Sequence, residues 1–240
     1  MDAREKLIVA LDVSSAAAAR KIVATLGDSV VTYKVGLQLY TAEGSQVVHD
    51  LISSGRQVFL DLKYHDIPNT VAAAVREAAG LGVAMLTVHA LGGRKMLRAA
   101  TEAAAAVDPQ VRVVAVTVLT SMDESELDQV GIQGGVLSEV TRLADLAASA
   151  GCHGVVASAR EASEIRSRLH PGEDFLIVTP GVRPAGAAHG DQARVVTPAQ
   201  AIAARASHIV VGRPIIEAAD PALAAREILA QMESVLPVNS

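Results

Sequence analysis

Residues 58–63 read Val58-Phe59-Leu60-Asp61-Leu62-Lys63, a short apolar run of strand-forming residues that ends in two charges. Similar runs recur at roughly even intervals, separated by helix-length segments rich in Ala, Glu and Arg. The runs occupy residues 7–11, 30–35, 58–62, 85–89, 111–119, 154–157, 175–178 and 208–211. Eight strands alternating with helices predict an α/β protein with a (β/α)8 barrel, in which residues 1–240 form a single domain.

The segments between the runs have the spacing of amphipathic helices, most clearly over residues 71–79, 94–106, 138–150 and 160–169. An open doubly wound sheet is the alternative fold, and it normally carries a glycine-rich turn after its first strand. Here the first run ends Ala10-Leu11-Asp12-Val13-Ser14, without glycine. This difference favours the barrel.

The composition limits the core and the partners. Half of the residues are hydrophobic, but the aromatic residues are only three Tyr and two Phe, so Ala, Val, Leu and Ile must fill the core. Few aromatic residues and a net charge of -5 argue against binding to nucleic acid or to a membrane surface. An anionic ligand would need a local cluster of positive charge and backbone N–H groups.

The single cysteine, Cys152, excludes an intrachain disulfide and suits a reducing compartment. Its neighbours look like a turn between a helix and a strand, so we expect a buried structural thiol rather than a reactive one. The chain shows neither a signal peptide nor an uncharged apolar stretch of about 18 residues. We therefore expect a cytoplasmic protein.

Polar residues end several of the apolar runs, and active sites of (β/α)8 barrels lie at the carboxyl ends of the strands. The residues in these positions are Asp12, Lys34, Asp61 with Lys63, His89, Thr120 and Gly212 with Arg213. Charged side chains thus recur where a barrel would have its site. For His89, a satisfied hydrogen bond is the simpler interpretation, although the ring could also line the site.

Alternation along the strands predicts a cluster of two acids and two lysines. Residues two apart on a strand face the same side, so Asp61 and Lys63 should project together, with Asp12 and Lys34 beside them. A lone Asp-x-Lys pair is more often a surface ion pair, worth about 0–1 kcal/mol. Four inward charges on three consecutive strands instead favour a site in which a lysine can donate a proton without a cofactor.

The last two strand ends suggest a phosphate site. Residues 179–192 form a long loop with three glycines, which suits a mobile lid. After the last run, Gly212-Arg213-Pro214 opens a helix, where free N–H groups and a guanidinium can bind phosphate. Phosphate sites in barrels often lie here, although a merely structural helix cap is the alternative.

The run Asp61-Leu62-Lys63-Tyr64-His65-Asp66-Ile67-Pro68-Asn69-Thr70 resembles the D-x-K-x-x-D-I-P-N-T motif of bacterial orotidine 5′-phosphate decarboxylases. The likeness extends from about residue 6 to 230, with two visible departures, Gln38 in place of an acid and Val182 in place of Ile. The further motifs are Leu7-Ile8-Val9-Ala10-Leu11-Asp12, Tyr33-Lys34-Val35-Gly36, Val116-Thr117-Val118-Leu119-Thr120-Ser121, Val178-Thr179-Pro180-Gly181-Val182-Arg183-Pro184, Gly190-Asp191-Gln192 and Val211-Gly212-Arg213-Pro214.

This resemblance implies decarboxylation of orotidine 5′-phosphate to UMP and CO2, the last step of de novo pyrimidine nucleotide synthesis, without metal or cofactor. It implies that Lys63 protonates C6 of the pyrimidine and that Asp61 lies beside the departing carboxylate. Lys34 would complete the charge network. It also implies a homodimer with shared sites, in which Asp66, Ile67 and Thr70 reach the neighbouring subunit's substrate.

The resemblance assigns the remaining residues to parts of the substrate. Asp12 and Lys34 would bind the ribose hydroxyls, and Pro180 would wall the apolar pocket of the carboxylate. Thr120 and Ser121 would contact the pyrimidine. The phosphate would be bound by Arg183, Gln192, Gly212 and Arg213.

Two alternatives remain. A metal-dependent sugar-phosphate decarboxylase or aldolase-type synthase shares the D-x-K-x-x-D run but has an acidic metal ligand where this chain has Lys34, which would repel a divalent cation. A non-catalytic nucleotide-binding regulator could keep Gly212 and Arg213 but would not need Asp61, Lys63 and Asp66 together. No cluster of His, Cys and acidic residues in the sequence has convincing metal-ligand spacing.

Overall fold

Eight short strands, each rich in Val, Ile or Leu, form the centre of the molecule, as expected for parallel strands buried on both faces. The computed structural model describes residues 2–170, 172, 174–184 and 196–236. The strands are β1 (Leu7–Ala10), β2 (Thr32–Gly36), β3 (Gln57–Tyr64), β4 (Met85–His89), β5 (Arg112–Val116), β6 (Gly154–Val156), β7 (Leu176–Thr179) and β8 (His208–Val211).

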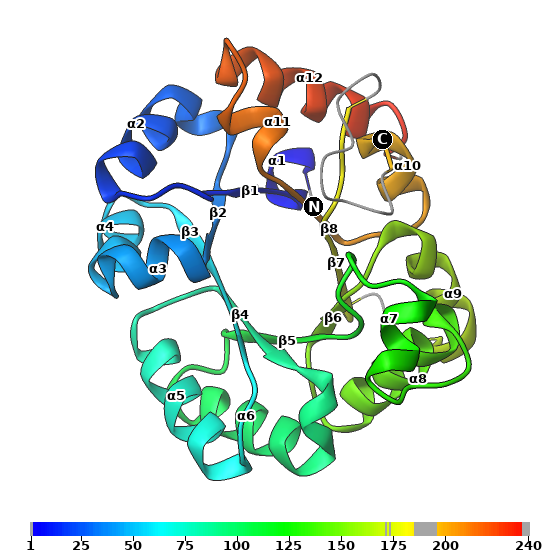
Figure 1. Cartoon of the computed structure of the whole chain (residues 1–240). Coiled ribbons are helices and arrows are strands. Elements are labelled where there is room, and N and C mark those ends of the chain that lie inside the picture. The colour runs from blue at the N-terminus through cyan, green and yellow to red at the C-terminus, as the bar shows by residue number, and fades with distance from the viewer. Residues whose placement is uncertain (1, 171, 173, 185–195, 237–240) are drawn as a thin grey trace.

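Helices follow the strands and form an outer ring around them (Figure 1). The longer helices are α2 (Ala16–Leu26), α4 (Gln46–Ser53), α5 (Pro68–Gly80), α6 (Gly93–Val107), α8 (Val136–Ser149), α9 (Ala159–Leu169) and α12 (Pro221–Glu233). The shorter ones are α1 (Ala3–Lys6), α3 (Leu37–Glu43), α7 (Glu124–Gln129), α10 (Pro198–Ala203), α11 (Arg213–Ile216) and the 3-10 turns η1 (Gly27–Ser29) and η2 (Ala90–Gly92).

The strands pair in parallel and in chain order, and β8 pairs with β1, so that the sheet closes into a barrel. The (β/α)8 prediction is therefore confirmed, and the open-sheet alternative is wrong. All four predicted helices are present, as α5, α6, α8 and α9. The predicted strand over residues 111–119 is shorter, because β5 ends at Val116 and the chain then leaves the sheet.

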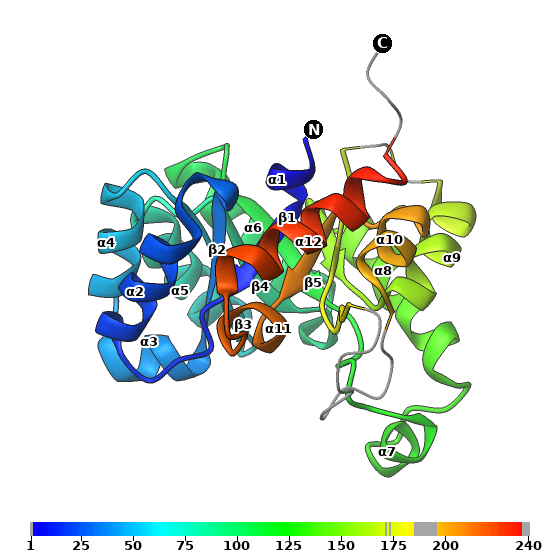
Figure 2. The same cartoon turned by 90° about the horizontal axis from the view of Figure 1, so that it is seen from above.

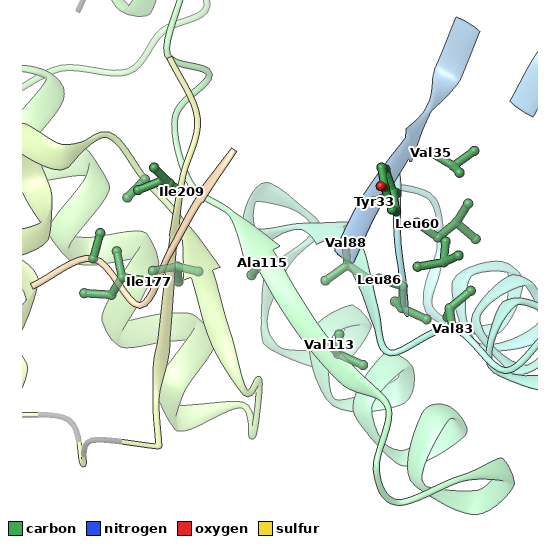
Figure 3. Packing of buried hydrophobic residues seen from close by; sticks show 14 of the residues in the cluster. Tyr33, Val35, Leu60, Val83, Leu86, Val88, Val113, Ala115, Ile177 and Ile209 are labelled. Carbon is green, nitrogen blue, oxygen red and sulfur yellow. The ribbon is translucent and has the colours of Figure 1, made fainter. Parts of the chain in front are cut away.

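The strand side chains divide between two cores. The interior of the barrel holds a small cluster of buried residues that includes Ile8, Phe59, Val114 and Val178. The opposite strand faces pack against the helices, and Figure 3 shows side chains of this larger core, among them Tyr33, Leu60, Leu86, Val88 and Ile209. The alternation of the two sets follows from the two-residue period of a strand.

The two ends of the barrel differ in what covers them. Helix α1 precedes β1 and lies at the opposite end from α7 and α11, which follow strand ends (Figure 2). The chain after β5 forms α7, whose start is fixed by a capping box between Asp123 and Glu126. None of the helices in the described part of the chain has the length and apolar character needed to cross a membrane.

Candidate active site

A cavity of about 480 Å³ opens at the carboxyl ends of the strands. Phe59 and Val210, which belong to the apolar cluster inside the barrel, form part of its lining, so the polar groups of the cavity stand on an apolar base. The sequence-predicted residues that line the cavity are Asp12, Lys34, Asp61, Lys63, Thr120, Pro180, Arg183, Gly212 and Arg213.

Four charged side chains form a continuous chain across the mouth of the cavity. The Lys34 ammonium lies 3.0 Å from an Asp12 oxygen and 3.7 Å from an Asp61 oxygen. The Lys63 ammonium donates to both Asp61 oxygens, at 2.9 Å each. Acids and lysines therefore alternate in the order Asp12, Lys34, Asp61, Lys63, so that each inner charge contacts two of opposite sign. The predicted cluster is confirmed, and the interpretation of Asp61 and Lys63 as a lone surface pair is wrong.

Alternation along a regular strand explains why Lys34 points into the cavity, but it does not explain the position of Lys63. Strands β1 and β2 keep a regular register, with Ala10 opposite Lys34. Between β3 and β4 the register shifts after Leu60, and Lys63 has a φ of 52°, in the left-handed region that non-glycine residues rarely adopt. Lys63 thus meets Asp61 through an irregularity of the strand and not through simple alternation.

Two guanidinium groups, those of Arg183 and Arg213, also line the cavity. Arg183 is buried, and its Nη1 donates to the carbonyl of Val182 at 3.1 Å. Burial, and then the charge of Arg213, lower the pKa of Arg183, whereas Glu217 has the opposite effect. Two neighbouring cations in a partly buried site favour an anionic ligand that would offset their repulsion.

Gly212 lets the chain pass close to the acidic end of the cavity. A Cβ atom at this position would lie 3.4 Å from both the Asp12 carboxylate and Ala10 Cβ, at the tight end of ordinary contact. Gly212 also precedes α11, whose first residue is Arg213. A ligand group next to the backbone here would lie between Asp12 and Arg213, two residues that the strand ends of β1 and β8 supply.

Several predicted residues do not line this cavity. Asp66, Ile67 and Thr70 follow β3 on an exposed segment, and 67% of Ile67 is accessible. The Asp66 carboxylate accepts the N–H of Ile67 at 2.6 Å. Ser121 is exposed and also lies outside the cavity lining, so this chain alone does not bring it to the site. Gln192, with residues 185–195 of the predicted lid, lies outside the described residues.

The histidine at the end of β4 has a structural environment. His89 accepts the N–H of Leu91 at 3.4 Å and stacks on His65, with 5.3 Å between ring centroids. Burial, followed by the charges of His65 and Lys63, lowers the pKa of His89 to about 4. The expected hydrogen-bonded role is confirmed. Over the described ranges, no group of three His, Cys, Asp or Glu residues is arranged to hold a metal ion.

The lone cysteine is likewise structural. Cys152 is buried, with 5% of its surface accessible, and burial raises the pKa of its thiol to about 12. The thiol therefore stays protonated and unreactive at neutral pH. The sequence-based expectation is confirmed.

Sequence reasoning missed three residues at or beside the site. Gln38 and Glu217 line the cavity, although the sequence analysis gave neither a role. Thr87, in the middle of β4, has a buried hydroxyl bonded to both Asp61 and Lys63. Its position two residues before His89, on the inward face of a strand, was the available indication.

Comparisons with known proteins agree with this geometry. Residues 5–228 match the orotidine 5′-phosphate decarboxylase / HUMPS family. Orotidine 5′-phosphate decarboxylase from Halorhodospira halophila is 54% identical over 227 residues, covering 95% of each chain. The protein of that name from Anaeromyxobacter dehalogenans is 53% identical over 230 residues, 96% of this chain and 99% of the relative.

A solved structure extends the comparison to the backbone. The crystal structure of orotidine 5′-phosphate decarboxylase from Lactobacillus acidophilus superimposes with a TM-score of 0.84 at 38% sequence identity. The match covers 94% of this chain and 98% of that one. The similarity therefore includes the barrel and the strand ends that build the cavity.

Proposed function

The chain belongs to the orotidine 5′-phosphate decarboxylase / HUMPS family, and on that basis we propose that it converts orotidine 5′-phosphate into UMP and CO2. The observation that carries the proposal is the alternating charge chain Asp12–Lys34–Asp61–Lys63 in a cavity that also contains two guanidinium groups. It offers a proton donor and an anion site within one cavity.

The proposed reaction breaks the bond between C6 of the pyrimidine and its carboxylate carbon. The electron pair remains on C6, and Lys63 delivers a proton from its ammonium group to that carbon as or after the bond breaks. Lys63 then regains a proton from solvent. Asp61, which accepts two hydrogen bonds from the Lys63 ammonium, orients this donor and lies next to the departing carboxylate.

Preorganised charge is the main source of the rate enhancement in this proposal. The carbanion at C6 has no adjacent electron sink, so the transition state needs stabilisation on the order of 20 kcal/mol, near the upper end for enzymes. One ammonium cannot supply that amount alone. A set of charges fixed before the substrate arrives, in a site that excludes water, stabilises developing charge without reorganisation.

The two ends of the substrate would be bound on opposite sides of the charge chain. Arg183, Arg213 and the backbone at Gly212 would bind the phosphate, together with Gln192 as the resemblance implies. The lowered pKa of Arg183 supports this, because an anion between the two guanidinium groups would offset their repulsion. Binding the distant phosphate can then contribute to catalysis at C6.

The remaining contacts follow the family resemblance. Asp12 and Lys34 would bind the ribose hydroxyls, with their 3.0 Å ion pair as a preformed clamp. Thr120 and Ser121 would contact the pyrimidine. Pro180 would wall the apolar pocket of the carboxylate, next to the lining residues Val156 and Val118.

We further propose a homodimer with shared sites, in which Asp66, Ile67 and Thr70 complete the site of the neighbouring subunit. Support comes from their position: they directly follow the strand that carries Lys63, yet none lines the cavity of its own chain. An exposed Ile67 is also unfavourable in a monomer, since burying a large aliphatic side chain is worth about 1.5–3 kcal/mol. The reaction belongs to nucleotide synthesis, which fits a cytoplasmic enzyme.

The rival proposal is a metal-dependent reaction on the same scaffold, because metal-dependent sugar-phosphate decarboxylases and aldolase-type synthases share the D-x-K-x-x-D run. Lys34 argues against it: its ammonium bonds to Asp12 and lies close to Asp61, the two carboxylates that a cation would otherwise use. The relatives from Halorhodospira halophila and Anaeromyxobacter dehalogenans share more than 50% of their residues with this chain over nearly its whole length, and both are named orotidine 5′-phosphate decarboxylase.

The test is an assay of the purified protein with orotidine 5′-phosphate in the presence of EDTA. We expect loss of the orotate absorbance and stoichiometric formation of UMP. Turnover that appears only after a divalent metal is added would favour the rival. Binding of UMP without any turnover, with or without metal, would favour the non-catalytic regulator.

A further inference from the structure

The upper part of strand β3 departs from regular pairing with β4. Phe59 pairs with Met85 and Leu60 with Leu86, but the next pair is Tyr64 with Val88. Residues 61–63 therefore stand opposite the single residue Thr87, in the manner of a β-bulge. This irregular segment contains both members of the Asp61–Lys63 pair.

The bulge places Lys63 in an unfavourable backbone conformation. Its φ of 52° lies in the left-handed region, which is unfavourable for a residue other than glycine because Cβ approaches the following carbonyl oxygen. Such a conformation persists only where the surroundings fix it. A group that satisfies the backbone of Lys63 in this conformation is therefore required.

Thr87 supplies that group. Its Oγ1 accepts the backbone N–H of Lys63 at 2.8 Å and donates its own hydrogen to Asp61 Oδ1 at 3.1 Å. The direction of the second bond follows from the first, because the amide can only donate and an ionised carboxylate can only accept. Thr87 is completely buried, so water does not compete for either bond.

We propose that Thr87 is a positioning residue for the reaction, acting through Asp61 and Lys63. One hydroxyl fixes both the backbone from which the Lys63 side chain starts and the carboxylate on which its ammonium ends. Thr87 itself does not line the cavity and has no contact with substrate in this account. The inference rests on the proposed roles of Asp61 and Lys63.

Another buried threonine provides a matched control. Thr179, at the end of β7, is also completely buried, and among the described residues its hydroxyl has no hydrogen-bond partner. Replacing Thr179 by Val therefore removes a hydroxyl from a similar environment without breaking a bond. The same replacement at Thr87 removes the group that joins Asp61 to Lys63, at nearly constant volume.

The experiment compares Thr87→Val, Thr87→Ser and Thr179→Val with the wild type by steady-state kinetics on orotidine 5′-phosphate. We expect Thr87→Val to lower kcat by about 10- to 100-fold, the loss typical of a misplaced catalytic group, while KM changes by less than about threefold. Thr87→Ser, which keeps the hydroxyl, should restore most of kcat, and Thr179→Val should behave as the wild type. Circular dichroism and thermal unfolding check that each variant is folded.

Three outcomes would overturn the proposal: a folded Thr87→Val variant with normal kcat, a loss confined to KM, or an equal loss of kcat in Thr87→Ser. If Thr87→Val does not fold, Thr87→Ala replaces it, and normal kcat there has the same meaning. The wild type measured in parallel distinguishes a failure of the proposed function from a failure of the role of Thr87. If it shows no turnover, the proposed function fails, whereas normal turnover in both wild type and Thr87→Val removes only the role of Thr87.

Discussion

The two acid–lysine pairs of the cavity are built in different ways. Lys34 lies on β2, which pairs with β1 in regular register, and Asp12 follows β1 two residues after its end; half of the Asp12 side chain is accessible. Asp61 and Lys63 come from a single strand that must bulge to bring them together, and only 13% of the Asp61 side chain is accessible. The first pair needs no local distortion, whereas the second depends on a strained residue and a buried threonine.

This difference suggests that the first pair binds substrate and the second takes part in the chemical step. A pair whose carboxylate is accessible can bind substrate hydroxyls and exchange partners with water at little cost. A pair whose carboxylate is mostly buried, in a distorted strand, is held in one arrangement, which suits a group that must meet a reacting carbon within a fraction of an ångström. Backbone strain at functional sites often has this association with a fixed geometry.

The largest expected effect on kcat comes from removing the Lys63 ammonium, the proposed proton donor of the Asp61–Lys63 pair. We expect Lys63→Ala to lower kcat by about 10⁴-fold or more, beyond the usual contribution of general acid catalysis, because it also removes a charge of the preorganised set. UMP binding, measured by calorimetry, should remain detectable. Near-normal turnover of the variant would exclude Lys63 as the proton donor.

Neutralising one acid of each pair tests the comparison directly. We expect Asp61→Asn to lower kcat by about 10²- to 10³-fold, because it leaves two ammonium groups facing one another in a buried site. Asp12→Asn should instead act mainly on KM, by about tenfold, since its carboxylate is accessible and is proposed to bind the ribose. Equal effects of the two variants on kcat would contradict the proposed division.

The segment after the bulge can be tested by mixing two inactive proteins. Lys63→Ala and Asp66→Ala variants that exchange subunits at random should regain about one quarter of wild-type activity, because half of the dimers are mixed and each has one intact site. Activity is measured after a denaturation–renaturation cycle of the mixture. Subunit exchange demonstrated by mass spectrometry without recovery of activity would contradict the shared site.

The smallest effect concerns His89, next to the buried pair. Its pKa, lowered to about 4, is below the value of about 6.5 expected in the unfolded chain, so the unfolded state takes up the proton first. The stabilisation is complete above pH 6.5 and is lost as the pH falls towards 4. Because the ring is partly exposed, we expect a loss of about 1 kcal/mol in unfolding free energy between pH 7 and 5.

The matching variant is His89→Gln, compared with the wild type by urea unfolding at pH 7 and pH 5. The variant should lose less stability over this interval. Part of the pH dependence should remain, because His208, whose pKa burial also lowers to about 4, titrates over the same interval. An unchanged pH dependence in His89→Gln would contradict this assignment.

The sequence alone could predict the barrel and most of the site. Alternating apolar runs and helix-length segments determine the order of the elements, and a barrel places the polar residues that end each run at one mouth. Lys34 was therefore predictable on the cavity side of its strand, because regular strands obey a two-residue period, and Asp12 was predictable as the polar residue that ends the first apolar run.

The bulge in β3 could not be predicted in this way. It depends on how β3 pairs with β4, and on a hydroxyl from Thr87 that lies 24 residues away from Lys63 in the chain. No glycine marks the left-handed residue, so the usual indication of such a conformation is missing. Gln38 and Glu217 lacked a pattern for a similar reason: Gln38 lies in α3 and Glu217 directly follows α11, and their side chains reach the cavity only through the fold.

The central claim, that Lys63 exchanges a proton with C6 of the pyrimidine in this cavity, can be measured without decarboxylation. By microscopic reversibility, a site that protonates the C6 carbanion must also remove the C6 proton of the product. Proton NMR of UMP in D2O with the wild-type enzyme and EDTA should therefore show loss of the C6 hydrogen signal, and no loss with Lys63→Ala. Exchange in the Lys63→Ala protein at the wild-type rate, or none in an active wild type, would contradict the account.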